Sequence, residues 1–157
     1  MKFVLIDKIT ELERGRTLKA VKVLSLAEEY LADHFPTFPV LPGVLMIEAL
    51  VQSAAFLVRA SEDFAHSMIV LKSARNVRYG NFVSPGDQLD IEVEAIEIGT
   101  ESSRFKGIGR IGTSKAVQAR FELMQFNLAD RRKEWSQVDH KIIREMKQRF
   151  SLLRGGD

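Results

Sequence analysis

The segment from His34 to Gly43 limits the fold more than any other part of the chain. It holds three of the chain's four prolines, Pro36, Pro39 and Pro42. A proline lacks the backbone N–H and pushes the preceding residue toward extended backbone, so this spacing excludes both a helix and a regular strand. We therefore predict a rigid loop of the polyproline II type, which can hold a side chain in a fixed position.

The residues that directly follow this loop have the opposite character. Residues 44–58 contain no glycine or proline and are apolar nearly all round, with Glu48, Gln52 and Ser53 as the polar exceptions. The length suits a helix of about four turns. A helix that is apolar on almost every side is buried, so we predict a central helix in the core.

Most of the remaining chain up to residue 124 has the short alternating pattern of β-strands. In residues 89–98, for example, Leu89, Ile91 and Val93 alternate with acidic residues, which is typical of a sheet that is wet on one face. The predicted strand segments are 3–9, 17–24, 68–73, 76–82, 89–98, 104–111 and 115–124. About six antiparallel strands with one buried helix predict an α+β fold in which the sheet wraps around the helix.

Length, composition and charge exclude several classes of protein. A chain of 157 residues suits one domain with a modest extension. Because cysteine is absent, disulfides, thiolate metal sites and a cysteine nucleophile are excluded. The 23 basic and 21 acidic residues do not make a nucleic-acid-binding composition. We find neither a signal peptide nor an uncharged run near the roughly 20 residues of a membrane span, and we expect a cytoplasmic protein.

The last thirty or so residues differ from the rest in charge. Residues 127–157 hold eight Lys and Arg against five Asp and Glu, a net charge of +3, so residues 1–126 carry −1 of the total of +2. Apolar residues recur there at near-helical spacing and predict an amphipathic helix over about 135–153. We expect it to pack on its own domain or on a neighbouring subunit, with a membrane surface or another partner as the alternative. The chain is thus divided into a domain, 1–126, and a basic extension, 127–157.

Three features of the loop and helix could carry chemistry together. A carboxylate in an apolar helix is costly unless it is paired, hydrogen-bonded or protonated, and Gln52 lies one turn from Glu48 on the same face. The alternative is that both simply face solvent, and His34 alone would more often be structural than catalytic. Together, His34, Glu48 and the free N–H groups at the Gly43 helix end supply a base, an acid and an oxyanion site. Those groups suit proton abstraction beside a carbonyl followed by β-elimination.

Residues 34–52, HFPTFPVLPGVLMIEALVQ, resemble the signature of the bacterial 3-hydroxyacyl-[acyl-carrier-protein] dehydratases of the FabZ type, which have the hot dog fold. The fourteen-residue separation of His34 and Glu48 matches the catalytic pair of that family. The similarity covers nearly all of residues 1–126. It continues in FVLIDK (3–8), NVRY (76–79), VSPGDQL (83–89), FKG (105–107) and ARFELM (119–124).

The resemblance implies a function and a role for each matching residue. The activity would be conversion of a (3R)-3-hydroxyacyl-carrier-protein thioester to the trans-2-enoyl thioester and water in fatty acid biosynthesis. His34 would remove the proton alpha to the thioester, and Glu48 would protonate the leaving 3-hydroxyl. The substrate-binding residues would be Gly43, whose N–H would hold the thioester carbonyl, with Val44, Gln52 and Phe38.

The resemblance also implies partners and an assembly. The acyl chain would arrive on the phosphopantetheine arm of an acyl carrier protein, and no metal or redox cofactor would be needed. His34 and Glu48 would come from opposite subunits of a homodimer, with three dimers forming a hexamer. Three basic residues at a predicted strand, Lys72, Arg75 and Arg78, could steer an acidic carrier or form an ordinary solvated strand face.

The chain departs from the family pattern in two places. Thr37 and Phe38 replace the usual Gly-His of the loop, and the basic extension lies beyond the usual end. A Glu at position 48 resembles the dehydratase-only branch, because the dehydratase/isomerase branch usually carries Asp there. Two other functions remain as alternatives: a hot dog fold acyl thioesterase, and a non-catalytic module that binds acyl chains or carrier proteins.

Overall fold

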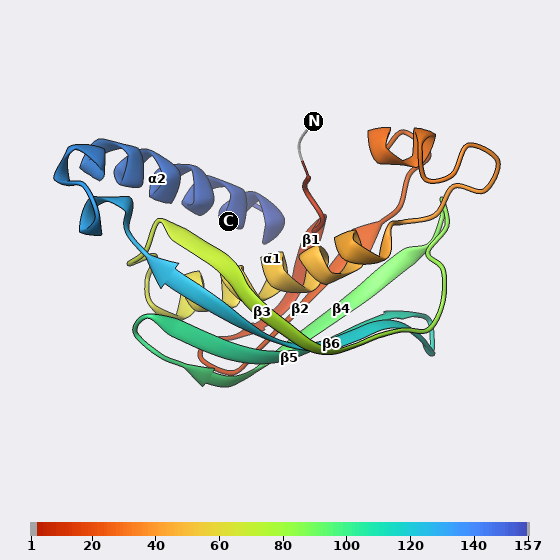
Figure 1. The fold of residues 1–157 in the computed structure, drawn as a ribbon, viewed down its shortest axis with the longest axis horizontal. Helices are drawn as coiled ribbons and strands as arrows, with labels where there is room; N and C mark the ends of the chain where they lie inside the picture. Colours follow the sequence, from red (N-terminus) through yellow and green to blue (C-terminus); the bar gives the residue numbers. More distant parts are fainter. Residues whose placement is uncertain (1–2, 157) are drawn as a thin grey trace.

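The computed structural model describes residues 3–156, in which six antiparallel strands curve around one long helix (Figure 1). Their order in the sheet is β1-β2-β4-β5-β6-β3. The strands are β1 (Lys8–Glu13), β2 (Thr17–Val23), β3 (Met68–Tyr79), β4 (Gln88–Ile98), β5 (Ser102–Ile111) and β6 (Ser114–Phe126). The helices are α1 (Gly43–Ser61) and α2 (Ser136–Leu153), with 3-10 turns η1 (Glu29–Ala32), η2 (Leu128–Asp130) and η3 (Lys133–Trp135). The predicted α+β architecture is confirmed.

The two edges of the sheet differ in length and chemistry. The β1 edge has six residues, three of them charged, and its pairing with β2 is shifted between Ile9 and Glu11. The β3 edge has twelve residues, and all six residues of its C-terminal half are exposed. A long exposed edge offers unpaired backbone N–H and C=O groups to another strand, whereas a short charged edge does not.

Two strand predictions were wrong. The first strand begins at Lys8. Before it, Phe3 and Leu5 bond to Gln52 of α1, and Asp7 donates its N–H to the Val21 carbonyl of β2 at 2.8 Å. The predicted strands 68–73 and 76–82 are a single strand, β3, whose pairing with β6 shifts between Leu71 and Ser73 and again between Arg75 and Arg78. Each shift is a bulge, which breaks the alternation of side chains without ending the strand.

The core lies between α1 and the concave face of the sheet. Fully buried side chains of α1, such as Leu50 and Leu57, meet inward-facing residues such as Ile91 and Phe105. At Gly107 the sheet comes so close that a Cβ atom would lie 3.2 Å from Leu50 Cδ1. By length and composition α1 could also span a membrane, but 72% of that stretch is buried inside the domain, as in the core helix of a soluble protein.

Helix α2 folds back over the side of α1 that the sheet leaves open (Figure 1). Phe150 stacks on Phe56, with ring centroids 5.9 Å apart, and meets the edge of Phe64 at 5.5 Å. Leu153 is buried, and Met146 packs against the core. The helix expected over 135–153 is therefore confirmed, and it packs on its own chain.

A buried carboxylate anchors the start of this extension. Asp139 accepts the backbone N–H groups of Leu128 and Ala129, both at 2.9 Å, and a hydrogen bond from the Ser67 hydroxyl. Burial alone would raise the pKa of Asp139, but these hydrogen bonds favour the carboxylate and lower the pKa below its ordinary value. Asn127 adds a second link, since its side chain accepts the Ser67 N–H at 2.9 Å.

Candidate active site

The proline-rich loop holds both the side chain and the backbone of His34 by hydrogen bonds to Val40. His34 Nδ1 lies 3.1 Å from the carbonyl oxygen of Val40, and the Val40 N–H donates to the His34 carbonyl at 3.0 Å. Phe35 and Phe38 exchange backbone hydrogen bonds of 3.0–3.1 Å within the loop. Because a carbonyl only accepts, Nδ1 carries the hydrogen, and in the neutral imidazole the lone pair is on Nε2. His34 is half-buried, with Nε2 as the nitrogen able to take a proton.

Glu48 and Gln52 meet on one face of α1, as their spacing predicted. Gln52 Nε2 donates to Glu48 Oε1 at 3.1 Å and to the Phe3 carbonyl at 3.0 Å. Gln52 Oε1 accepts the Leu5 N–H at 3.1 Å. The two backbone groups fix which end of the amide faces Glu48, so Gln52 presents a donor to the carboxylate. Both side chains are half-buried, and the interpretation that they simply face solvent is wrong.

The N-terminus of α1 begins at Gly43 without a side-chain cap. Among the described residues, no acceptor receives the N–H groups of Gly43 and Val44. A Cβ atom on residue 43 would lie 2.9 Å from the Tyr79 ring, so glycine allows that ring to cover the helix end. Free N–H groups at the positive end of a helix dipole suit an oxyanion.

Large apolar side chains gather around this helix end and remain exposed. Phe38 packs edge-to-face on Phe82, with centroids 5.4 Å apart, which joins the loop to the segment after β3. Val44 is 72% exposed, Phe82 66% and Tyr79 53%. Exposed apolar side chains that lie together in this way are typical of a ligand-binding or protein-binding surface. The predicted site residues Phe38 and Val44 both belong to it.

A buried lysine links the two halves of the site, and sequence reasoning missed it. Lys22 Nζ lies 2.7 Å from Glu28 Oε1 and 3.3 Å from Asp7 Oδ2. Asp7 ends the segment whose residues Phe3 and Leu5 bond to Gln52, while Glu28 directly precedes η1, which leads to His34. The signal was present in the strand pattern, because Lys22 shares the inward face of β2 with Leu18 and Ala20.

The structure brings Glu48 and Gln52 together but does not join them to His34. Within residues 3–156, the ring of His34 and the carboxylate of Glu48 share no hydrogen bond. In the same described range, no group of three or more His, Cys, Asp or Glu side chains could hold a metal ion. One chain therefore holds His34 and Glu48 in separate hydrogen-bond networks.

Comparison with solved structures shows the same fold. The chain aligns with a chain of the dehydratase heterocomplex ApeI:P from Xenorhabdus doucetiae with a TM-score of 0.68 and 18% identity, covering 85% of this chain and 90% of that one. It also aligns with smu.793 from Streptococcus mutans UA159, solved bound to acetyl CoA, with a TM-score of 0.58 and 14% identity over 76% and 87% of the two chains. At such identities the likeness establishes the fold alone, and the expected hot dog fold is confirmed.

Comparison of sequences is more specific. A family model described as a FabA-like domain matches residues 1–118. The chain is 38% identical to the 3-hydroxyacyl-[acyl-carrier-protein] dehydratase FabZ of Bacillus subtilis (strain 168), over 69% of this chain and 77% of that protein. It is 36% identical to FabZ of Geobacillus thermodenitrificans (strain NG80-2), over 82% and 87% of the two chains. This chain therefore belongs to the FabA-like family, among the FabZ-type dehydratases.

Proposed function

We propose that this protein is a 3-hydroxyacyl-[acyl-carrier-protein] dehydratase, a hydro-lyase of fatty acid biosynthesis that acts in the cytoplasm. The observation that carries the proposal is a base and an acid held ready by separate hydrogen-bond networks, His34 by Val40 and Glu48 by Gln52. Family membership supports the reaction, because the FabZ relatives bear that name. The substrate would be a (3R)-3-hydroxyacyl thioester on the phosphopantetheine arm of an acyl carrier protein.

The reaction is an elimination of water. Nε2 of His34 takes the proton from the carbon alpha to the thioester, and those electrons form the 2,3 double bond. The bond between C3 and its hydroxyl breaks, and Glu48 gives its proton to the departing oxygen, which leaves as water. His34 then loses and Glu48 regains a proton, so the enzyme is restored. No net oxidation occurs, and no redox cofactor is needed.

The remaining predicted residues bind the substrate in this proposal. The N–H groups of Gly43 and Val44 point from the start of α1 and would stabilise the negative charge that develops on the thioester oxygen. Gln52 would hold Glu48 in position. Phe38, with Phe82 and Tyr79 beside it, would form an apolar wall for the acyl chain.

We also propose that the active unit is a homodimer in which His34 and Glu48 come from opposite subunits. The separation of these two side chains in one chain, the exposed apolar group near Val44 and the long open β3 edge all support this arrangement. A trimer of dimers would be the full assembly. Residues 1–126 would be the catalytic domain and 127–157 an extension to it.

The test is hydration of a crotonyl thioester by purified variants. His34→Ala and Glu48→Gln should keep their fold and oligomeric state and lose activity by about 100- to 10,000-fold. His66→Ala is the matched control, because His66 Nδ1 binds Glu62 at 2.9 Å outside the site and should leave the rate unchanged. Wild-type rates in both site variants would end the proposal.

The same preparations separate the two alternatives. A thioesterase would release a free thiol from an acyl thioester, which a thiol-trapping dye detects. A non-catalytic binding module would bind the thioester tightly without turnover. The dehydratase proposal requires formation of the enoyl or hydroxyacyl product with no release of thiol.

A further inference from the structure

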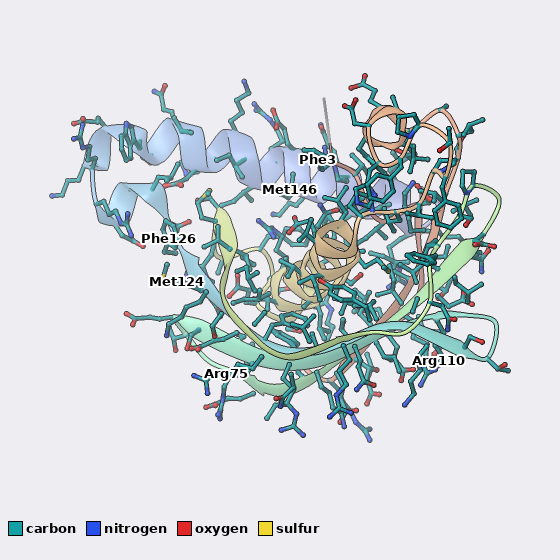
Figure 2. All side chains as sticks on the ribbon, turned by 45° about the vertical axis from the view of Figure 1, so that its right-hand side comes forward. Phe3, Arg75, Arg110, Met124, Phe126 and Met146 are labelled. Carbon is teal, nitrogen blue, oxygen red and sulfur yellow. The ribbon has the colours of Figure 1, made fainter. Side chains whose placement is uncertain are left out.

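The convex face of the sheet, which points away from α1, carries rows of charged side chains across neighbouring strands (Figure 2). In one row the signs alternate. Lys72 Nζ binds Glu122 Oε1 at 2.9 Å, and Arg104 Nη2 binds Glu97 Oε2 at 2.6 Å. Each charge in this row, which we call the balanced row, has a partner.

The adjacent row is not balanced. Arg75 on β3 lies opposite Arg120 on β6, and Arg120 lies opposite Lys106 on β5. Lys106 binds Glu94 at 3.0 Å, but within residues 3–156 neither Arg75 nor Arg120 has an ion-pair partner. Like charges directly opposite one another destabilise a sheet. We call Arg75, Arg120 and Lys106 the cationic row. An anion bound there would offset the repulsion between these like charges.

A bulge adds a further arginine to the same face. Arg75 and Arg78 are three residues apart, so a regular strand would place them on opposite faces. The pairing of β3 with β6 shifts between them, and Asn76 takes a φ of +52°, a left-handed conformation that asparagine adopts more readily than most residues other than glycine. As a result Arg78 lies opposite Gln118, on the face that carries Arg120. Arg78 also has no ion-pair partner within the described range.

These groups border a groove of about 560 Å³ on the convex face. Its β3 and β6 side is formed by Asn76, Arg78, Gln118 and Arg120, which offer guanidinium and amide N–H groups. Its β4 and β5 side is formed by ion pairs that include Lys106 with Glu94. The volume is within the roughly 300–1,000 Å³ of small-molecule sites. Planar guanidinium groups bind phosphate oxygens in pairs, which makes phosphate a suitable ligand for the unpaired side.

We propose that this groove binds a small phosphorylated molecule, with its phosphate held by Arg78 and Arg120 and its uncharged part lying toward β5. Glu92 and Glu94 border the far side and would repel an extended acidic surface, which favours a compact ligand over an acidic protein. The groove lies on the opposite face of the sheet from α1 and Glu48. It is thus a second site, independent of the proposed dehydratase chemistry.

The test is isothermal titration calorimetry of the full-length protein at low ionic strength with three probes: ADP, inorganic pyrophosphate and adenosine. ADP and pyrophosphate should bind, and adenosine should not. The double variant Arg78→Gln/Arg120→Gln should weaken ADP binding by at least about tenfold, because two charge-assisted contacts are lost. The matched control, Lys72→Gln/Arg104→Gln, removes the same charge from the balanced row and should bind ADP as the wild type does.

Three results would overturn the proposal. They are the absence of binding by both ADP and pyrophosphate at millimolar concentration, equal weakening in the two double variants, and binding of an acidic carrier protein at these arginines without binding of either phosphate probe. Hydration of a crotonyl thioester, measured on the same proteins, should be unchanged in both double variants. A failure at the groove is therefore distinguishable from a failure of the proposed function.

Discussion

The two ends of α1 are finished in different ways. At its C-terminal end, Phe56 and Phe64 are covered by Phe150 of α2, and the nearby Asp139 carboxylate is fully hydrogen-bonded. At its N-terminal end, the N–H groups of Gly43 and Val44 have no acceptor within the described residues, and Val44 is mostly exposed. One chain completes the first end by itself, whereas the second end has the features of a surface that needs another molecule. The difference separates the end of α1 that is stabilised within the chain from the end at which we propose the reaction.

The largest effect that would sharpen this comparison is recovery of activity by mixing two inactive variants. If His34 and Glu48 act across a dimer, a mixed dimer of His34→Ala and Glu48→Gln has one intact site. Equal mixing after reversible dissociation should restore about a quarter of the wild-type rate, since half the dimers are mixed and each has one of two sites. The measurement is hydration of a crotonyl thioester before and after mixing. No recovery, with subunit exchange verified by mass spectrometry, would place both residues in one chain's site.

A smaller effect is expected when Gln52 is changed. Gln52→Ala removes the donor to Glu48 and both bonds to residues 3–5, so the carboxylate loses its fixed position. We expect kcat to fall by about 10- to 100-fold, because misplacement of a catalytic group by about 1 Å costs that much. Gln88→Ala, on the solvent side of β4, is the control. Equal kcat values in the two variants would mean that Gln52 only packs.

At the other end of the helix the expected effect is on stability. Phe150→Ala removes a ring that packs on Phe56 and Phe64, and should lower the free energy of unfolding by about 2–3 kcal/mol. Urea unfolding measures this loss. The activity of the folded variant should stay at the wild-type level; a large fall in kcat without a fall in stability would show that α2 also shapes the active site.

The smallest predicted effect concerns Asp139 and depends on pH. Because the folded protein lowers the pKa of this carboxyl, its contribution is complete above the ordinary value of 3.8 and is lost as the pH falls through the folded pKa. Asp139→Asn should therefore cost about 1–2 kcal/mol near neutral pH and less in acid. Unfolding curves of both proteins at several pH values give this difference. A difference that is independent of pH would contradict the role of the carboxylate.

The irregular backbone of the loop and the central helix could be predicted because their causes are local. The polyproline II conformation was wrong for residues 35–38, where Phe35 and Phe38 close a hydrogen-bonded turn. Prolines spaced by three exclude a helix or a regular strand. An apolar run of fifteen residues without glycine or proline, as in residues 44–58, predicts a buried helix. The spacing of Glu48 and Gln52 likewise placed them in contact, as the structure confirms. The roles of His34 and Glu48 in catalysis stay predictions, and so does the boundary near residue 127.

The features that sequence reasoning missed depend on distant parts of the chain. Residues 3–7 have the apolar pattern of a strand, but the Gln52 amide binds the backbone of Phe3 and Leu5 from 47 or more positions away. The bulges of β3 arise from its pairing with β6, and the pattern of one strand cannot distinguish a bulge from a break. In the sequence, Asp139 is one of several polar residues of an amphipathic helix. Its partners, Ser67 and the backbone of η2, are identified only by the fold.

The unequal edges of the sheet also set how far an assembly can grow. Sheets that stay open at both edges can add copies without end, which is the geometry of fibres. Here only the β3 edge is long and exposed, whereas β1 is short, bulged and charged. Two copies joined through β3 would leave a β1 strand at each outer edge, and neither would offer a good template. Edge-to-edge growth would then stop at two chains, so a dimer of this kind would not extend into a fibre.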